Sequence, residues 1–376
     1  MGLLRLVAGQ VQIGQPLPFS VRDEHGQLLL AQGQIIDSAA QLEQLLQRGS
    51  TVDEAEVEQA RRQQAAAAPD TTRRLTLFDL WGRAINRLER LQTGLGTEHG
   101  TPERWAAFAD DFVALVDRDT DVAIYLSVRQ DPQRMRLYGL THALHCALVA
   151  CLMASPLGWS AARRQSVLLA AMTMNLSIVE LQGFLATHGG RPTDKQREAI
   201  RGHPQQAFET LQAAGVTDPD WLQAVAQHHE VEDGSGYPAG LTAPSESAVA
   251  LRLADVFMAK ISPRVERPGL PIQEAARQMF QGSGGSPLAA AVVRAFGLYP
   301  PGDFVRLASG ELAVVIRRGE DARTPLVASV TDRSGIPIVN TIQRDTRHAA
   351  FAIVGPARDS KLVLRVPPER LYGLGT

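Results

Sequence analysis

Cysteine is scarce in this sequence. Its 376 residues include only Cys146 and Cys151, which stand five positions apart on a predicted helix and so do not share a face of it well. Two such thiols do not make the disulfide framework of a secreted protein. They fit a reducing compartment, with both thiols in the hydrophobic core. We therefore expect a cytoplasmic protein.

No charge of one sign dominates. The chain has 38 Lys and Arg against 40 Asp and Glu, a formal net charge of -2. This balance argues against nucleic acid or an anionic membrane as the partner, but it permits a local basic pocket for one small anion. Long apolar runs are also missing, since none reaches the roughly 18 residues of a transmembrane helix. The first residues lack the charged lead-in of a signal peptide, so we expect no membrane insertion.

The length and the 44% share of hydrophobic residues indicate two or three folded domains. Residues 1–52 predict a small α+β unit. Apolar runs flank the turn sequence Asp23-Glu24-His25-Gly26, which indicates a hairpin, and Ser38 can cap a short helix after it. Residues 53–72 contain almost no large apolar side chains and predict a linker.

The centre of the chain, residues 73–299, is predicted to be helical because apolar residues recur at steps of three and four. After two initial helices, further helices are expected at about 135–155, 160–186, 193–214, 218–229, 246–260, 271–281 and 286–297. Residues 300–376 contain short β-branched segments between glycine turns and predict a small antiparallel β domain. The fold class is therefore mainly α, with a helical bundle between two small units.

Histidines gather in this helical centre. Six of the nine lie between positions 142 and 229, and five of these bear on a site: His142, His145, His203, His228 and His229. Adjacent helical residues point about 100° apart, so His228 and His229 can serve one site only if that site is wide, such as a metal cluster. A lone helical histidine is usually a core residue, which fits His145. Asp255 stands in an apolar helix, where an ion pair and a metal ligand are equally good explanations.

A glycine-rich turn follows the histidine pair. The sequence "DGSGYPAGL" places Gly234, Gly236 and Gly240 around Tyr237 and Pro238. Glycines permit positive φ and close backbone approach. An exposed aromatic ring beside such a turn can stack on a base or a sugar.

The segment "HHEVEDGSGYPAGL" resembles the signature of the HD-GYP family, a branch of the metal-dependent HD phosphohydrolases that acts on the bacterial second messenger cyclic di-GMP. "PTDKQREAIRGHP" and "ADVFMAKISPR" resemble two further family segments, and the resemblance covers roughly residues 135–285. It implies an HD-GYP helical bundle. It also implies a set of metal ligands: His142, His203, His228, His229 and Asp255.

The sequence departs from the family where the histidine–aspartate pair should stand. Here it reads "AAMTMNLSI", with Met174 in place of the histidine, Asn175 in place of the bridging aspartate and Ile178 in place of a phosphate-facing lysine. An amide cannot bridge two cations as a carboxylate does, and methionine is a poor ligand for hard or borderline metals. We therefore assign no catalytic residue and expect either one divalent metal (Fe, Mn or Zn) or none.

Three hypotheses remain open for the function. The first is a degenerate HD-GYP signalling protein that binds cyclic di-GMP or a partner protein without efficient hydrolysis. The second is an active cyclic di-GMP phosphodiesterase with an atypical metal site, and the third is a structural interaction scaffold. Residues that would contact the ligand are Asn175, Asp233, Gly234, Gly236, Tyr237 and Pro238. Four nearby basic residues are expected either to meet phosphate or, more simply, to form a solvated helix face: Arg191, Lys195, Arg197 and Arg201.

Overall fold

The computed structural model describes residues 3–5, 16–23, 25–36, 38–47, 50–53, 56, 75–130, 135, 137–265, 267–357 and 368–373. The chain divides into two compact units, Met1–Arg74 and Leu75–Thr376. Nearly all of the predicted linker, residues 53–72, lies outside the described residues, as do most of the first 15 residues.

In its described residues the N-terminal unit contains a small antiparallel sheet and the helix α1, as predicted. Its strands follow the order β1-β4-β2-β3. The predicted hairpin is confirmed: β2 pairs with β3, and the Asp23 amide donates to the Gln27 carbonyl across a turn in which Gly26 has a φ of 80°. The Ser38 hydroxyl caps the helix by accepting from the Gln41 amide. The elements are β1 (Leu3–Arg5), β2 (Val21–Arg22), β3 (Leu28–Leu30), α1 (Ala39–Gln47) and β4 (Thr51–Asp53).

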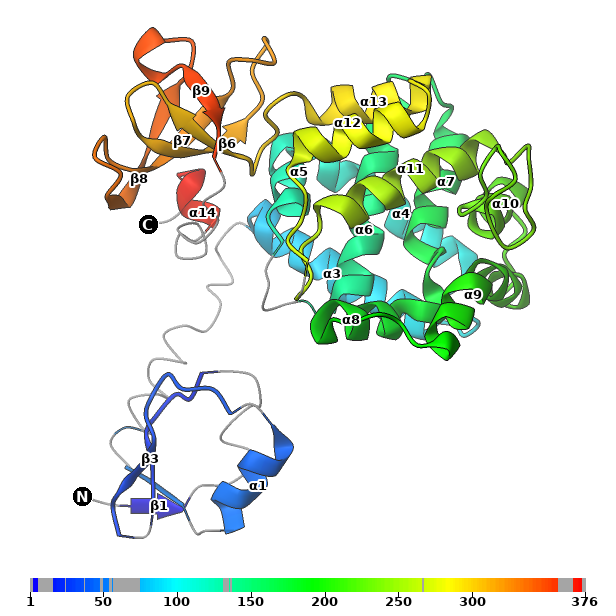
Figure 1. The fold of residues 1–376 in the computed structure, drawn as a ribbon. Coiled ribbons are helices and arrows are strands. Elements are labelled where there is room, and N and C mark those ends of the chain that lie inside the picture. Colours follow the sequence, from blue (N-terminus) through cyan, green and yellow to red (C-terminus); the bar gives the residue numbers. More distant parts are fainter. Residues whose placement is uncertain are drawn as a thin grey trace. The chain divides into compact units, whose positions relative to one another are not determined.

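The second unit begins with the helical bundle, which confirms a mainly α fold (Figure 1). Helix α6 runs through its core with all but two residues buried, and it packs against α7, α8, α11 and α13. The helices are α3 (Leu77–Thr93), α4 (Pro102–Arg118), α5 (Thr120–Val128), α6 (Tyr138–Ala154), α7 (Ala161–Thr173), η3 (Leu176–Ile178), α8 (Val179–His188), α9 (Asp194–Ala213), α10 (Pro219–Gln227), α11 (Glu246–Ile261), α12 (Ile272–Gly282) and α13 (Pro287–Phe296).

The single helix expected over residues 160–186 is wrong in one respect. Helix α7 ends at Thr173, a short 3-10 turn follows as η3, and α8 begins at Val179. The Ile178 amide donates to the Asn175 carbonyl, which closes the turn. Asparagine competes with the helical backbone for hydrogen bonds and favours such breaks. The break places η3 against α9, where the Ser177 hydroxyl donates to the His203 carbonyl.

The run Ala161–His188, which spans α7 to α8, has a composition that the sequence expectation overlooked. The run is 28 residues long, and an 18-residue window within it has a mean hydropathy of 1.4, which is long and apolar enough to cross a membrane by that measure alone. However, 61% of its most apolar window is buried inside the protein, as in the core helix of a soluble protein. The absence of membrane insertion stays a prediction.

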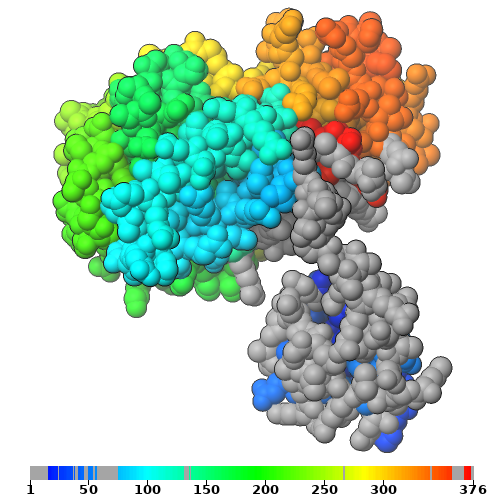
Figure 2. Space-filling view, turned by 180° about the vertical axis from the view of Figure 1, so that it is seen from behind, coloured from blue at the N-terminus to red at the C-terminus, as the bar shows by residue number. Residues whose placement is uncertain are grey.

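The chain ends in an antiparallel sheet with the strand order β8-β7-β6-β5-β9, which confirms the predicted β segment. The sheet packs against α5, and Figure 2 shows it (orange) in direct contact with the helical part. Arg317 and Arg318 on this side form ion pairs with Asp119 and Asp121. The elements are β5 (Phe304–Leu307), β6 (Leu312–Arg317), β7 (Leu326–Thr331), β8 (Pro337–Asp345), β9 (Ile353–Pro356) and α14 (Pro368–Leu371).

Candidate metal centre

The five predicted metal ligands come from four elements of the bundle. His142 lies on α6, His203 on α9 and Asp255 on α11. The helix predicted over 218–229 ends earlier, at Gln227, so His228 is the C-cap residue of α10 and His229 follows it. The donor atoms form two groups, in each of which all the atoms lie within 4.8 Å of one another: His203, His228 and His229 in one, and His142, Cys146 and Asp255 in the other.

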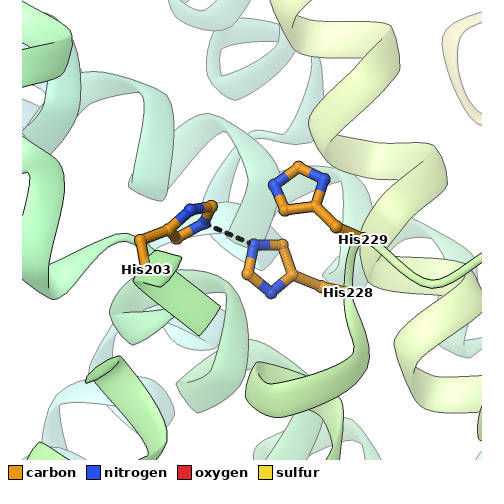
Figure 3. Close-up of side chains that lie close together, drawn as sticks. All are labelled: His203, His228 and His229. Carbon is orange, nitrogen blue, oxygen red and sulfur yellow. Dashed lines mark hydrogen bonds between the residues drawn. The ribbon is translucent and has the colours of Figure 1, made fainter. Parts of the chain in front are cut away.

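The three histidines of the first group converge on one another (Figure 3). The Nε2 atoms of His203 and His228 are 3.0 Å apart. The ring centroid of His229 lies 4.3 Å from that of His228 and 5.0 Å from that of His203. The donor atoms of the adjacent His228 and His229 therefore lie close to that of His203 in one group.

The backbone fixes the tautomers of two of these rings. His203 Nδ1 lies 2.5 Å from the Ile200 carbonyl oxygen, and His228 Nδ1 lies 2.6 Å from that of Val225. A carbonyl oxygen only accepts, so both Nδ1 atoms carry hydrogen. In the neutral rings, both Nε2 atoms are then bare lone pairs that face each other, which is unfavourable unless a cation lies between them.

A proton is a poor choice for that cation. Burial, helped by the neighbouring imidazoles, lowers the pKa of His203 to about 4 and that of His228 well below its usual value. At neutral pH both rings are therefore neutral. Neutral imidazoles whose Nδ1–H is held by a carbonyl are the form in which histidine binds a divalent metal through Nε2. The donor set thus fits a metal ion.

The second group lies on the side of α6 and α11. His142 Nε2 and Asp255 Oδ1 are 2.7 Å apart, and Cys146 Sγ lies 3.5 Å from the same His142 nitrogen. Burial raises the pKa of Asp255, but the hydrogen bond and charge of His142, with help from His229 and His228, bring the pKa well below its usual range. The carboxylate is therefore an anion held among histidines, and both open readings of Asp255, ion pair and metal ligand, fit its geometry.

The glycine-rich turn supports His229. The Tyr237 ring stacks on the His229 ring with centroids 4.5 Å apart, and the Arg201 guanidinium lies 5.8 Å from the Tyr237 centroid. The expectation of an exposed tyrosine ring was therefore wrong, because the imidazole covers one face. A Cβ on Gly236 would lie 2.4 Å from the Val231 nitrogen and 2.5 Å from the Glu230 Cα, so only glycine fits there.

Of the other residues predicted to contact the ligand, two are more exposed to solvent than Tyr237 and one is buried. Asp233 and Pro238 are exposed, and the Asp233 carboxylate accepts from the Ser235 amide and hydroxyl. Gly234 has a φ of 77° in the same turn. Asn175 is only 4% exposed, and its Nδ2 has no hydrogen-bond partner among the described residues. Glu230, which precedes the turn, is buried. Its carboxylate accepts hydrogen bonds from the amides of Ala239 and Leu241 and so closes the loop.

Six other side chains behave as core or surface residues. His145 stacks on Trp81, and burial lowers its pKa to about 3, which confirms the simpler interpretation of a lone helical histidine. Met174 is fully buried in the main core. The basic residues Arg191, Lys195, Arg197 and Arg201 are exposed, as a solvated face requires, and only Arg201 contacts the turn.

Cys146 is the residue that sequence reasoning assigned to the core alone. Both cysteines are buried and free, as predicted. Cys146, however, also stands among candidate metal ligands. The four-residue spacing from His142 on one helix could have indicated this, because side chains at that spacing lie on the same face.

The bundle and its two groups of candidate metal ligands are features of the HD-domain class. Residues 131–285 match the HD-domain family model. Together with the turn sequence, this match supports a likeness of this part of the chain to the HD-GYP family.

Two curated relatives and one solved structure are similar to the chain. The cyclic di-GMP phosphodiesterase PA4108 of Pseudomonas aeruginosa is 35% identical over 40% of this chain and 37% of its own length. The cyclic di-GMP phosphodiesterase response regulator RpfG of Xanthomonas campestris pv. campestris is 30% identical over 31% of this chain and 32% of its own length. The chain therefore spans about a third of these relatives. The structure of Bd1817, an HDG"Y"P protein from Bdellovibrio bacteriovorus, is 16% identical, with a TM-score of 0.48, and the match covers 77% of this chain and 98% of that one.

Proposed function

We propose that this protein is a degenerate HD-GYP signalling protein that binds cyclic di-GMP or a partner protein without efficient hydrolysis. The observation that carries the proposal is the end of α7, where Met174 and Asn175 occupy the positions assigned by sequence to the family's histidine–aspartate pair. Met174 points into the apolar core and Asn175 carries no charge. Neither supplies what a bridged pair of metal ions needs.

The expected loss of activity can be sized. Removal of one preorganised electrostatic donor typically costs about 10²–10³ in rate, and loss of a bridging ligand removes a whole metal ion. The histidine trio, with His142 and Asp255, would still hold one divalent metal: Fe, Mn or Zn. When bound, such a metal supplies a positive charge for a phosphate and lowers the pKa of its water.

Cyclic di-GMP is the ligand of choice for the proposal because both curated relatives are named as phosphodiesterases of this messenger. Asn175 offers a buried amide donor without a partner among the described residues. We propose that it meets the ligand together with the turn: Asp233, Gly234, Gly236, Tyr237 and Pro238. Tyr237 would do so through its edge or its remaining face, since His229 covers the other.

The flanking parts are proposed to bind a signalling partner. We divide the chain into a unit at 1–52, a linker at 53–72, the helical domain at 73–299 and a β domain at 300–376. We place the protein in the cytoplasm, in keeping with two free, buried thiols.

Calorimetry with cyclic di-GMP tests the proposal on the full chain. We expect saturable binding, lost in Asn175→Leu, which removes the free amide donor, and retained in Ser235→Ala on the exposed rim of the turn. Absence of binding at about 100 μM ligand, an affinity weaker than about -5.5 kcal/mol, would reject the messenger-binding half of the proposal. A pull-down with the separate flanking units would then address the partner-binding half.

A turnover assay with added Mn or Fe addresses the second candidate function, an active phosphodiesterase. It is favoured by the convergence of five donors in two adjacent groups. Conversion of cyclic di-GMP to its linear dinucleotide or to GMP by the wild-type protein, abolished in His228→Gln, would establish that alternative instead.

A further inference from the structure

Cys146 has the geometry of a metal ligand. It follows His142 by one helical turn on α6, so both side chains leave the same face of the helix. Its Sγ lies 3.5 Å from His142 Nε2, which in turn lies 2.7 Å from Asp255 Oδ1. The three donor atoms come from two helices and lie within 4.8 Å of one another, so they form a small triangle.

We propose that the Cys146 thiolate is a ligand of the bound metal, together with His142 and Asp255. This inference rests on the proposed metal site and assigns that site a sulfur donor. It also assigns a metal class, because thiolates favour Zn²⁺ and Co²⁺ over the harder Mn²⁺ and Mg²⁺. The step is an exchange without redox change: the S–H bond breaks, a metal–sulfur bond forms, and the proton passes to solvent.

Charge balance supports a thiolate here. A divalent cation in a buried site needs anionic ligands, since an uncompensated buried charge is costly. Asp255 supplies one negative charge, and Asn175, which replaces the expected bridging aspartate, supplies none. A thiolate at Cys146 brings the total charge of the ligands to minus two and neutralises a divalent metal. The negative charge that is missing at Asn175 is thus replaced by the negative charge of the Cys146 thiolate.

Cys151 provides a matched comparison within the same helix. It is also a buried free thiol, but it belongs to neither group of candidate ligands among the described residues. The chain contains no third cysteine. Any metal–thiolate bond in this protein is therefore made by one of two residues that mutation can separate.

Titration of the purified full chain with Co²⁺ tests the proposal. Cobalt bound to a thiolate gives an intense charge-transfer band in the near ultraviolet, whereas cobalt bound only by nitrogen and oxygen gives weak visible bands. We expect the charge-transfer band in wild type and in Cys151→Ser, and its loss in Cys146→Ser. A band that persists in Cys151→Ser identifies Cys146 even where Cys146→Ser fails to fold.

Competition with a chelator adds a second measurement. Mutation of a residue that only hydrogen-bonds to a metal ligand typically lowers metal affinity about 10–100-fold, and loss of a ligand itself should cost at least as much. Cys146→Ser should therefore weaken Zn²⁺ binding by more than about tenfold and Mn²⁺ binding by much less, and Cys151→Ser should change neither. Cobalt that binds without a charge-transfer band would overturn the role of Cys146 and leave the metal site standing. If wild type binds no cobalt at all, both the proposed metal site and the proposed thiolate ligand are rejected. Binding of cyclic di-GMP is tested separately by calorimetry.

Discussion

His203 Nε2 lies 3.0 Å from His228 Nε2, and each ring is held through Nδ1 by a backbone carbonyl. The carbonyls prescribe the tautomers, so two lone pairs face each other in a site where burial disfavours protonation. The protein thus holds two imidazoles in an arrangement that only a cation satisfies well.

Metal should therefore stabilise the fold. At 100 times its Kd, a divalent metal adds about 2.7 kcal/mol to the free energy of unfolding. We expect Zn²⁺ to raise the unfolding temperature by several degrees and a chelator to reverse the rise. His228→Gln should lose this response with little cost to the metal-free protein, because the substitution removes one of the facing lone pairs. His145→Phe, outside both groups, should keep the response, and a rise that persists in His228→Gln would contradict this account.

Restoring the histidine–aspartate pair is the sharpest test of how α7 aligns with the family. Met174→His with Asn175→Asp returns a ligand and a bridging carboxylate to the site. We expect a second equivalent of bound metal by elemental analysis and a gain of at least about 10² in cyclic di-GMP hydrolysis. Met174→Leu, which only repacks the core, is the control. Gain of neither metal nor activity would show that "MTMNLSI" is wrongly aligned.

The sequence predicts the fold class and the site ligands for different reasons. Steps of three and four apolar residues predict the helices of the bundle, and the N-terminal hairpin follows from the turn around Gly26. The motif names His203, His228 and His229, but the tautomers depend on the Ile200 and Val225 carbonyls, which only the folded backbone places.

Other features of the site could not be predicted from local pattern. The break after Thr173 goes with the packing of η3 against α9, a tertiary contact, so the run reads as one continuous helix in sequence. The sequence predicts an exposed Tyr237 ring because the stacking of this ring on His229 depends on the fold of the turn, which the motif does not reveal. Cys146 looks like any core thiol until α11 brings Asp255 beside it.

The turn should tolerate no side chain at Gly236. An added Cβ would meet the Val231 nitrogen at 2.4 Å and the Glu230 Cα at 2.5 Å, and backbone atoms cannot swing aside. Gly236→Ala should shift the loop that carries Tyr237, at a cost of about 1–3 kcal/mol. Calorimetry should then show weaker binding of metal and of cyclic di-GMP. Ser235→Ala, the exposed neighbour, is the matched control, and wild-type binding by Gly236→Ala would show that the turn is free to move.

His145 should make the fold acid-sensitive. Burial lowers its pKa from 6.5 to about 3, so between these values the unfolded chain binds a proton that the folded protein does not. The stabilisation is complete above pH 6.5 and is lost progressively as the pH falls towards 3, by up to about 1.4 kcal/mol per pH unit. His145→Phe keeps an aromatic ring against Trp81 and removes this titration, so its urea-unfolding free energy should fall less steeply between pH 6.5 and 4.5. His348→Phe, at an exposed site, isolates the effect of burial, and equal slopes for wild type and His145→Phe would refute it.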